Sequence, residues 1–174
     1  EPDPLLPPVD DHQGMVRIFT DPGIVGIGLS LEHAVPDPEA PETRARRTRE
    51  LHTALAFNML QQRLNKMALQ RDTSFIAPQV NVSTNLQGWR VSSLSFPSKQ
   101  LAWRLLTADA EQALRRARTY GFTASELAEA KKAFRTYYEQ GARSAATTPS
   151  DSLATQLAVS IANDNVFSSP GIIW

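Results

Sequence analysis

Three histidines, His12, His33 and His52, are the strongest candidates for metal chemistry in this 174-residue sequence. A metallopeptidase site needs two histidines about one helical turn apart, with a carboxylate that activates the metal-bound water. No histidine here has a second one within five positions, so neither H-E-x-x-H nor H-x-x-E-H occurs. Each histidine is therefore interpreted as a surface or half-buried side chain. We expect no catalytic residue and no metal ligand in this chain.

The sequence also lacks the patterns of nucleophilic and phosphate chemistry. It contains no cysteine, which excludes disulfides, thiolate zinc sites and thiol nucleophiles. No serine lies in the G-x-S-x-G turn of a hydrolase. Gly23, Gly26 and Gly28 lack the G-x-G-x-x-G order and the P-loop lysine. They are interpreted as a strand face where a helix or another backbone comes close, and no cofactor is expected on this chain.

The charge balance excludes two classes of partner. Eighteen lysines and arginines offset 18 aspartates and glutamates, and a neutral domain has no long-range field to gather nucleic acid or an anionic membrane. The basic run of Arg44, Arg46, Arg47 and Arg49 contains no aromatic residue and is interpreted as a solvated helix face. No apolar run approaches the roughly 20 residues that span a bilayer. Neither nucleic-acid binding nor membrane insertion is therefore expected.

Aromatic and acidic residues near the end of the sequence fit structural roles. Phe134, Tyr137 and Tyr138 indicate helix packing rather than a stacking platform. The acids between 126 and 139 alternate with basic residues at 131–135, which is typical of pairing on a helix surface. These residues assemble no catalytic site.

Apolar spacing predicts two strand segments followed by one long helix. Residues 15–19 are apolar enough for a strand, and Asp-Pro-Gly at 21–23 forms a turn. Residues 25–31 alternate apolar with small or polar side chains, the period of a strand with one buried face. Three prolines between 36 and 41 then end the strand region. From 42 to about 70 there is no proline or glycine, and leucines and methionines recur at helical spacing, which predicts one amphipathic helix.

A β-hairpin is predicted after this helix. Residues 74–83 and 89–96 are extended runs, and the polar segment 85–88 joins them. The apolar parity of the second run switches between Val91 and Leu94. This switch indicates a bulge or an irregular edge.

The rest of the sequence is predicted to be helical. One helix has its apolar face at positions 101, 105, 110, 114 and 117 and ends at Tyr120, where Gly121 supplies a left-handed cap. The next begins with a capping box of Thr123 and Glu126, flanked by Phe122 and Leu127 as a hydrophobic staple.

A final helix begins at 148–151, where a proline and an acid mark the first turn. Its inner face is expected to be Leu153, Leu157 and Ile161.

The predicted fold class is α+β. Two strand segments, a long helix, a hairpin and two or three helices fit a two-layer arrangement, a mainly antiparallel sheet with helices packed on one face. Four prolines in the first eight residues favour an extended polyproline stretch. Residues 1–14 are therefore expected to be a proline-rich interdomain linker, and residues 15–174 a single domain of a longer parent protein.

Four segments carry a family resemblance: Phe19-Thr-Asp-Pro22, Leu60-Gln-Gln-Arg-Leu64, Tyr120-Gly-Phe-Thr-Ala-Ser-Glu-Leu127 and Ala130-Lys131. Together they resemble the zinc metallopeptidase family of pitrilysin, insulin-degrading enzyme and the mitochondrial processing peptidase. The Gly-Phe-Thr-x-x-Glu-Leu segment is the most specific, because family members carry it at the same helix–helix junction. The resemblance spans residues 16 to 161 or so and implies the core order β-α-β-β-α-α.

The resemblance implies an indirect role in proteolysis. In this family one domain of a pair usually carries H-x-x-E-H and a more distant glutamate ligand, and the other closes a chamber around the peptide. Because the three histidines are scattered, the chain is expected to be the second kind: a non-catalytic substrate-chamber domain of a bacterial multidomain zinc metallopeptidase. Zinc is expected only in the separate catalytic domain of the parent.

The resemblance also implies the partners. They are the sibling catalytic domain, in the same parent chain or in a partner subunit, and a peptide substrate. Peptide can add to an exposed sheet edge through backbone hydrogen bonds, and the strand at 25–31 is the candidate for that contact, with simple packing as the other interpretation. The resemblance favours the bacterial periplasm over the cytoplasm and leaves the compartment open.

Two other functions stay open. The parent protein can be a family member that has lost peptidase activity and acts as a scaffold, like the structural core subunits of respiratory complexes. An H-x-x-E-H motif elsewhere in the parent would favour the peptidase. The third possibility is a free-standing peptide-binding adaptor domain that uses an exposed strand edge.

Overall fold

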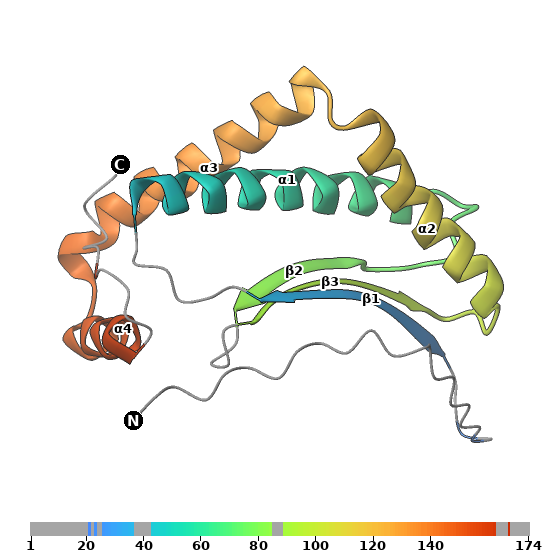
Figure 1. Cartoon of the computed structure of the whole chain (residues 1–174), viewed down its shortest axis with the longest axis horizontal. Coiled ribbons are helices and arrows are strands. Elements are labelled where there is room, and N and C mark those ends of the chain that lie inside the picture. Colours follow the sequence, from blue (N-terminus) through green and yellow to red (C-terminus); the bar gives the residue numbers. More distant parts are fainter. Residues whose placement is uncertain are drawn as a thin grey trace. The chain divides into compact units, whose positions relative to one another are not determined.

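The computed structural model describes residues 21, 23, 26–36, 43–84, 89–162 and 167. The expected strand at 15–19 and loop at 85–88 lie outside these residues. The elements, in chain order and as labelled in Figure 1, are β1 (Ile27–Pro36), α1 (Arg44–Ala68), β2 (Gln79–Thr84), β3 (Trp89–Ser98), α2 (Trp103–Tyr120), α3 (Ala124–Ser144), the 3-10 turn η1 (Ala145–Thr147) and α4 (Ser150–Ala162).

The fold is α+β, as predicted. Its described part contains a three-stranded antiparallel sheet and four α-helices, and the chain order begins β-α-β-β-α-α. The chain divides into two compact units, one of residues 1–38 with 67–111 and one of residues 39–66 with 112–174. None of the helices in the described ranges is both long enough and apolar enough to cross a membrane.

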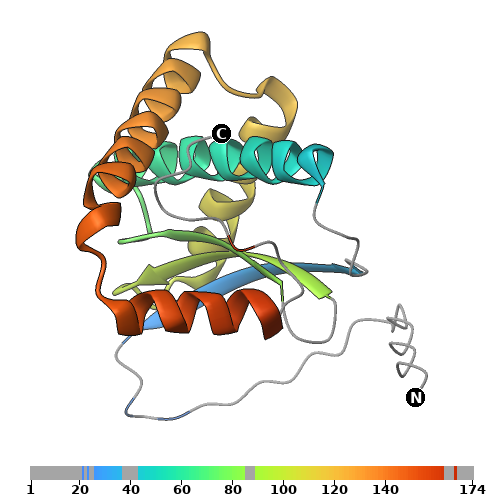
Figure 2. The same ribbon diagram turned by 90° about the vertical axis from the view of Figure 1, so that its left-hand side faces the viewer.

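The sheet belongs to the first unit and has the strand order β1-β3-β2 (Figures 1 and 2). β3 pairs antiparallel with both neighbours. The register places Leu29 opposite Phe96 and Leu31 opposite Leu94, and on the other side Val80 opposite Leu94. Because directly opposite residues share a face, these side chains form one apolar face of the sheet.

β1 confirms the alternating strand in its described residues. Half-buried and exposed side chains alternate along its first six positions, and the strand continues to Pro36. Gly26, directly before β1, lies against β3: a Cβ added there would be 2.9 Å from the carbonyl oxygen of Ser98. A Cβ on Gly28 would meet nothing within 4 Å. The close backbone approach expected at the glycines is therefore confirmed at Gly26 and wrong at Gly28.

The bulge expected between Val91 and Leu94 is wrong. The residues of β3 from Trp89 to Ser98 pair one by one with β1 in an unbroken register. Val91 and Leu94 are an odd number of positions apart, so their side chains lie on opposite faces of the strand. The change of parity therefore means that this central strand carries an apolar residue on each of its two faces, Val91 on one and Leu94 on the other.

β2 begins at Gln79, later than the start at 74 that the sequence predicts. The preceding segment departs from extended geometry because Ala77 has a φ of +43°, in the left-handed region that side chains disfavour. Pro78, which is buried, then fixes the entry into the strand.

The segment before β2 is anchored to β3. The Ile76 N–H donates to the carbonyl oxygen of Pro97 at 2.8 Å. The Phe75 and Phe96 rings meet edge to face with centroids 5.1 Å apart, and both are fully buried. This aromatic pair lies in the core of the first unit.

Polar side chains tie the same segment to α2. The N–H and hydroxyl of Ser74 both donate to Asp109 Oδ2, at 3.0 and 2.6 Å. The Ser98 hydroxyl donates to the Ser74 carbonyl oxygen at 2.6 Å. Both serines are buried, and these hydrogen bonds satisfy their polar groups in the core.

α1 confirms the long helix expected from 42 to about 70. Leu51, expected on its inner face, is 41% exposed. The buried residues of the helix are Leu55, Met59, Leu60 and Leu64.

A second apolar cluster joins α1 to α3 within the second unit. Its buried members are Leu55 and Met59 of α1 and Ala130 of α3. The half-buried residues packed against it are Phe122, Leu127 and Phe134. Both residues of the predicted hydrophobic staple therefore pack at the start of α3.

α2 ends as predicted, and its predicted inner face is confirmed at Ala110 and wrong at Leu101 and Leu105. Gly121 follows the helix with a φ of +63°, the left-handed cap that glycine adopts without strain. Leu105 is 48% exposed, whereas its neighbour Leu106 is buried together with Ala110 and Ala113. The helix begins at Trp103 rather than at 101. Its buried residues, Leu106, Ala110 and Ala113, are spaced by four and three positions, as one face of a helix requires.

α4 begins directly after Pro149, whose carbonyl oxygen accepts a hydrogen bond from the Leu153 N–H at 3.1 Å. The inner face expected for this helix is wrong in its second half. Leu157 is 45% exposed and Ile161 is 72% exposed. Their apolar side chains follow helical spacing but do not join the cores of the described residues.

Candidate functional site

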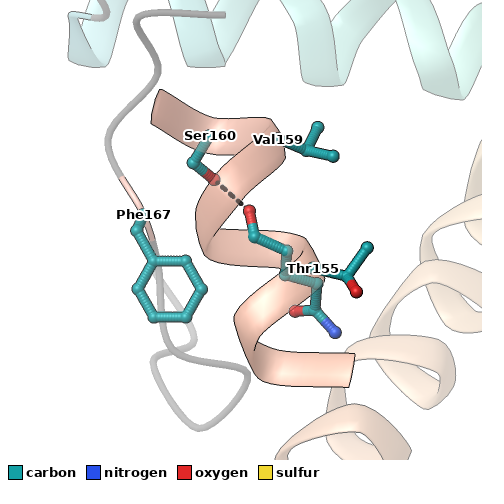
Figure 3. Close-up of a pocket in the computed structure, with 5 residues that line it drawn as sticks. Thr155, Val159, Ser160 and Phe167 are labelled. Carbon is teal, nitrogen blue, oxygen red and sulfur yellow. Dashed lines mark hydrogen bonds between the residues drawn. The ribbon is translucent and has the colours of Figure 1, made fainter. Parts of the chain in front are cut away.

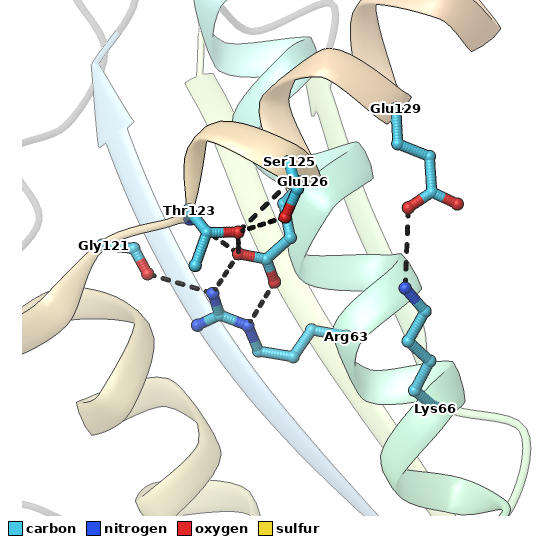
Figure 4. A network of polar contacts seen from close by, with 7 residues as sticks. All are labelled: Arg63, Lys66, Gly121, Thr123, Ser125, Glu126 and Glu129. Carbon is cyan, nitrogen blue, oxygen red and sulfur yellow. Dashed lines mark hydrogen bonds and ion pairs between the residues drawn. The ribbon is translucent and has the colours of Figure 1, made fainter.

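Two of the segments that carry the family resemblance meet in the second unit (Figure 4). Arg63 of α1 binds Glu126 of α3 through two parallel hydrogen bonds, Nε to Oε1 at 2.9 Å and Nη2 to Oε2 at 2.8 Å. Nη2 also donates to the Gly121 carbonyl oxygen at 3.1 Å, and Cζ lies 4.7 Å from the centroid of the Phe122 ring. One arginine thus holds α1 to the α2–α3 junction.

Glu126 also closes the capping box that the sequence predicts. The Thr123 N–H donates to Glu126 Oε2 at 2.7 Å, and the Glu126 N–H donates to Thr123 Oγ1 at 3.3 Å. The Thr123 hydroxyl donates to the same carboxylate at 3.0 Å and lies 3.1 Å from the Ser125 hydroxyl. The carboxylate therefore caps its own helix and binds α1 at the same time.

These contacts keep Glu126 ionised. Hydrogen bonds from the Arg63 guanidinium and from Thr123 lower the pKa of Glu126 to about 2, although partial burial acts in the opposite direction. A general acid or base works best with a pKa near the working pH. Glu126 has no proton to donate at neutral pH and is a weak base. The network therefore positions α1 against the start of α3.

A weaker ion pair lies beside this network. Lys66 Nζ of α1 is 3.5 Å from Glu129 Oε2 of α3, and both side chains are more than half exposed (Figure 4). The expected pairing of the acids at 126–139 with basic residues of their own helix is wrong for Glu126 and Glu129. Both carboxylates bind α1 instead.

The histidines do not build a metal centre in the described structure. His33 lies on β1 and His52 on α1, both exposed, and His12 lies outside the described residues. Within the ranges that the structure describes, no three His, Asp or Glu residues are grouped to hold a metal ion. A catalytic zinc ion therefore does not fit these residues.

The other candidate surfaces show ordinary helix chemistry. In the basic run of α1, Arg46 Nε binds Glu50 Oε1 at 2.8 Å, one turn further along. Phe134 packs on the α1–α3 cluster, as predicted. Tyr137 is 72% exposed and Tyr138 is 47% exposed. The Tyr138 ring contacts the rings of Phe134 and Tyr137 on the same helix, with centroids 6.3 and 5.4 Å apart. Packing against α1 is therefore confirmed for Phe134, and the tyrosines contact rings of their own helix.

A pocket of about 320 Å³ lies against α4 (Figure 3). Its lining residues carry hydroxyl, amide and apolar groups: Thr155, Gln156, Val159, Ser160 and Phe167. The two hydroxyls donate to carbonyl oxygens one turn earlier in the same helix, at 2.9 Å each. The residues that line the pocket include no carboxylate, imidazole or amine, so they supply no general acid or base.

Solved bacterial proteases have a similar fold. The match to the periplasmic protease PqqL from Escherichia coli has a TM-score of 0.75 at 16% sequence identity, and it covers 83% of this chain and 16% of that chain. The first half of PqqL gives a TM-score of 0.67 at 17% identity, over 83% of this chain and 31% of that chain. For a predicted insulinase family protease from Yersinia pestis the TM-score is 0.67 at 16% identity, over 82% of this chain and 31% of that chain. No protein-family model and no curated protein matches the chain.

These matches show an insulinase-like fold, which confirms the fold that the family resemblance implies. The chain spans less than a third of the length of each of the three solved chains. The contact between Arg63 and Glu126 was not predicted, although both residues lie in segments that carry the resemblance. They are 63 positions apart, and no local pattern pairs them.

Proposed function

We propose that this chain is a non-catalytic domain of a bacterial multidomain zinc metallopeptidase. A separate domain with an H-x-x-E-H motif binds zinc and cleaves the peptide. The present domain packs beside it and forms part of the wall that confines the unfolded peptide.

One observation carries the proposal: an insulinase-like fold, with a TM-score of 0.75 to a periplasmic protease, occurs in a sequence without H-x-x-E-H. A zinc peptidase of the H-x-x-E-H type needs two histidines and a carboxylate on one helix. α1, the long helix between β1 and β2, carries the single histidine His52 and has instead the arginine that docks on α3.

The charge of the chain is consistent with this role. A wall that meets many peptide sequences must not select strongly by charge, and the net charge of this chain is zero. β1 lies at an edge of the sheet formed by the described strands, and peptide addition to that edge stays a prediction.

A cleavage assay tests the proposal. The purified chain is incubated with excess zinc and an internally quenched peptide, and a known zinc endopeptidase serves as the positive control. We expect no cleavage above the rate without protein. Turnover that a chelator abolishes and zinc restores would overturn the non-catalytic assignment.

The sequence of the parent protein separates this function from the scaffold alternative. An H-x-x-E-H motif in a sibling domain supports the peptidase. If every sibling lacks the motif, the peptidase proposal is wrong and the scaffold function takes its place.

A further inference from the structure

We draw no further inference here: the strongest candidate, the exposed apolar side of α4 that carries Leu157 and Ile161, supports no proposal because nothing in the described part of the structure shows what covers it.

Discussion

Replacing Arg63 by methionine is expected to destabilise the chain strongly, because one side chain makes three kinds of contact. The two-bond contact with Glu126, whose partners are 24% and 21% exposed, is expected to contribute about 1 kcal/mol, the upper end for exposed pairs. The hydrogen bond to the Gly121 carbonyl contributes about 1 kcal/mol. The contact with the Phe122 ring contributes about 0.5 kcal/mol. Arg63→Met should therefore lower the free energy of unfolding by about 2 to 3 kcal/mol.

Lys66→Met is the matched control. It removes the same charge from the same helix, and its partner Glu129 also lies on α3. Its ion pair is longer, at 3.5 Å, and joins side chains that are 66% and 58% exposed. The expected loss is below about 0.5 kcal/mol. Urea unfolding followed by circular dichroism measures both variants, and equal losses would refute the assignment of Arg63 as the tie between α1 and the junction.

The same network predicts a pH dependence. The pKa of Glu126 falls from 4.5 to about 2 on folding, so its contribution is fully present above pH 4.5 and is lost as the pH falls toward 2. After allowance for solvent screening, that contribution is about 1 to 2 kcal/mol. Arg63→Met raises the pKa of Glu126 toward its ordinary value and should remove most of this dependence, as should Glu126→Gln. Parallel stability curves for the wild type and both variants over this pH range would contradict the coupling.

Three further pairs of substitutions test the local geometry, all by urea unfolding. Gly26→Ala should cost about 1 to 2 kcal/mol, because the new Cβ would lie 2.9 Å from a β3 carbonyl oxygen. Gly28→Ala, in open space, should be neutral or stabilising by less than about 1 kcal/mol, and equal effects at the two glycines would disprove the close approach. Ala77→Gly should stabilise by about 0.5 kcal/mol by relieving a positive φ, whereas Ala77→Val should destabilise, and the opposite order would show that the backbone is not strained there. Thr123→Ala should cost about 1 kcal/mol and Thr123→Ser much less, and equal losses would argue against the capping box.

Local signals in the sequence predict most of the elements. Before Glu32, apolar residues alternate strictly with small or polar ones, which indicates a half-buried strand. Gly121 followed by the Thr123 capping box indicates a boundary between two helices. Each signal works over a few residues, because hydrogen bonds and side-chain periodicity act over that range. The fold class follows from the order of such elements.

Some helix and strand boundaries and buried faces were predicted wrongly because they depend on contacts between residues far apart in the sequence. The start of β2 is delayed because Phe75 and Ile76 are held by β3, which draws the chain away from regular pairing. Leu105 and Leu106 are equally apolar, but only Leu106 shares a face of α2 with the buried Ala110 and Ala113.

The contact between Arg63 and Glu126 could not be predicted from the sequence for a related reason. Its carboxylate has basic neighbours at helical spacing along α3, so a local pattern favours pairing within that helix. The observed partner lies 63 residues earlier, and only the packing of α1 on α3 brings the two together. The Thr123 half of the network is predicted because it is local, and the Arg63 half is not.

A zinc titration tests the central claim most directly. The chain, freed of metal, is titrated with zinc at neutral pH by isothermal calorimetry, and a protein with an H-x-x-E-H site is titrated in parallel. The account predicts weak binding without defined stoichiometry for this chain, because its histidines are scattered and the described carboxylates form no ligand group. Tight binding of one zinc ion per chain would contradict the assignment of this domain as non-catalytic.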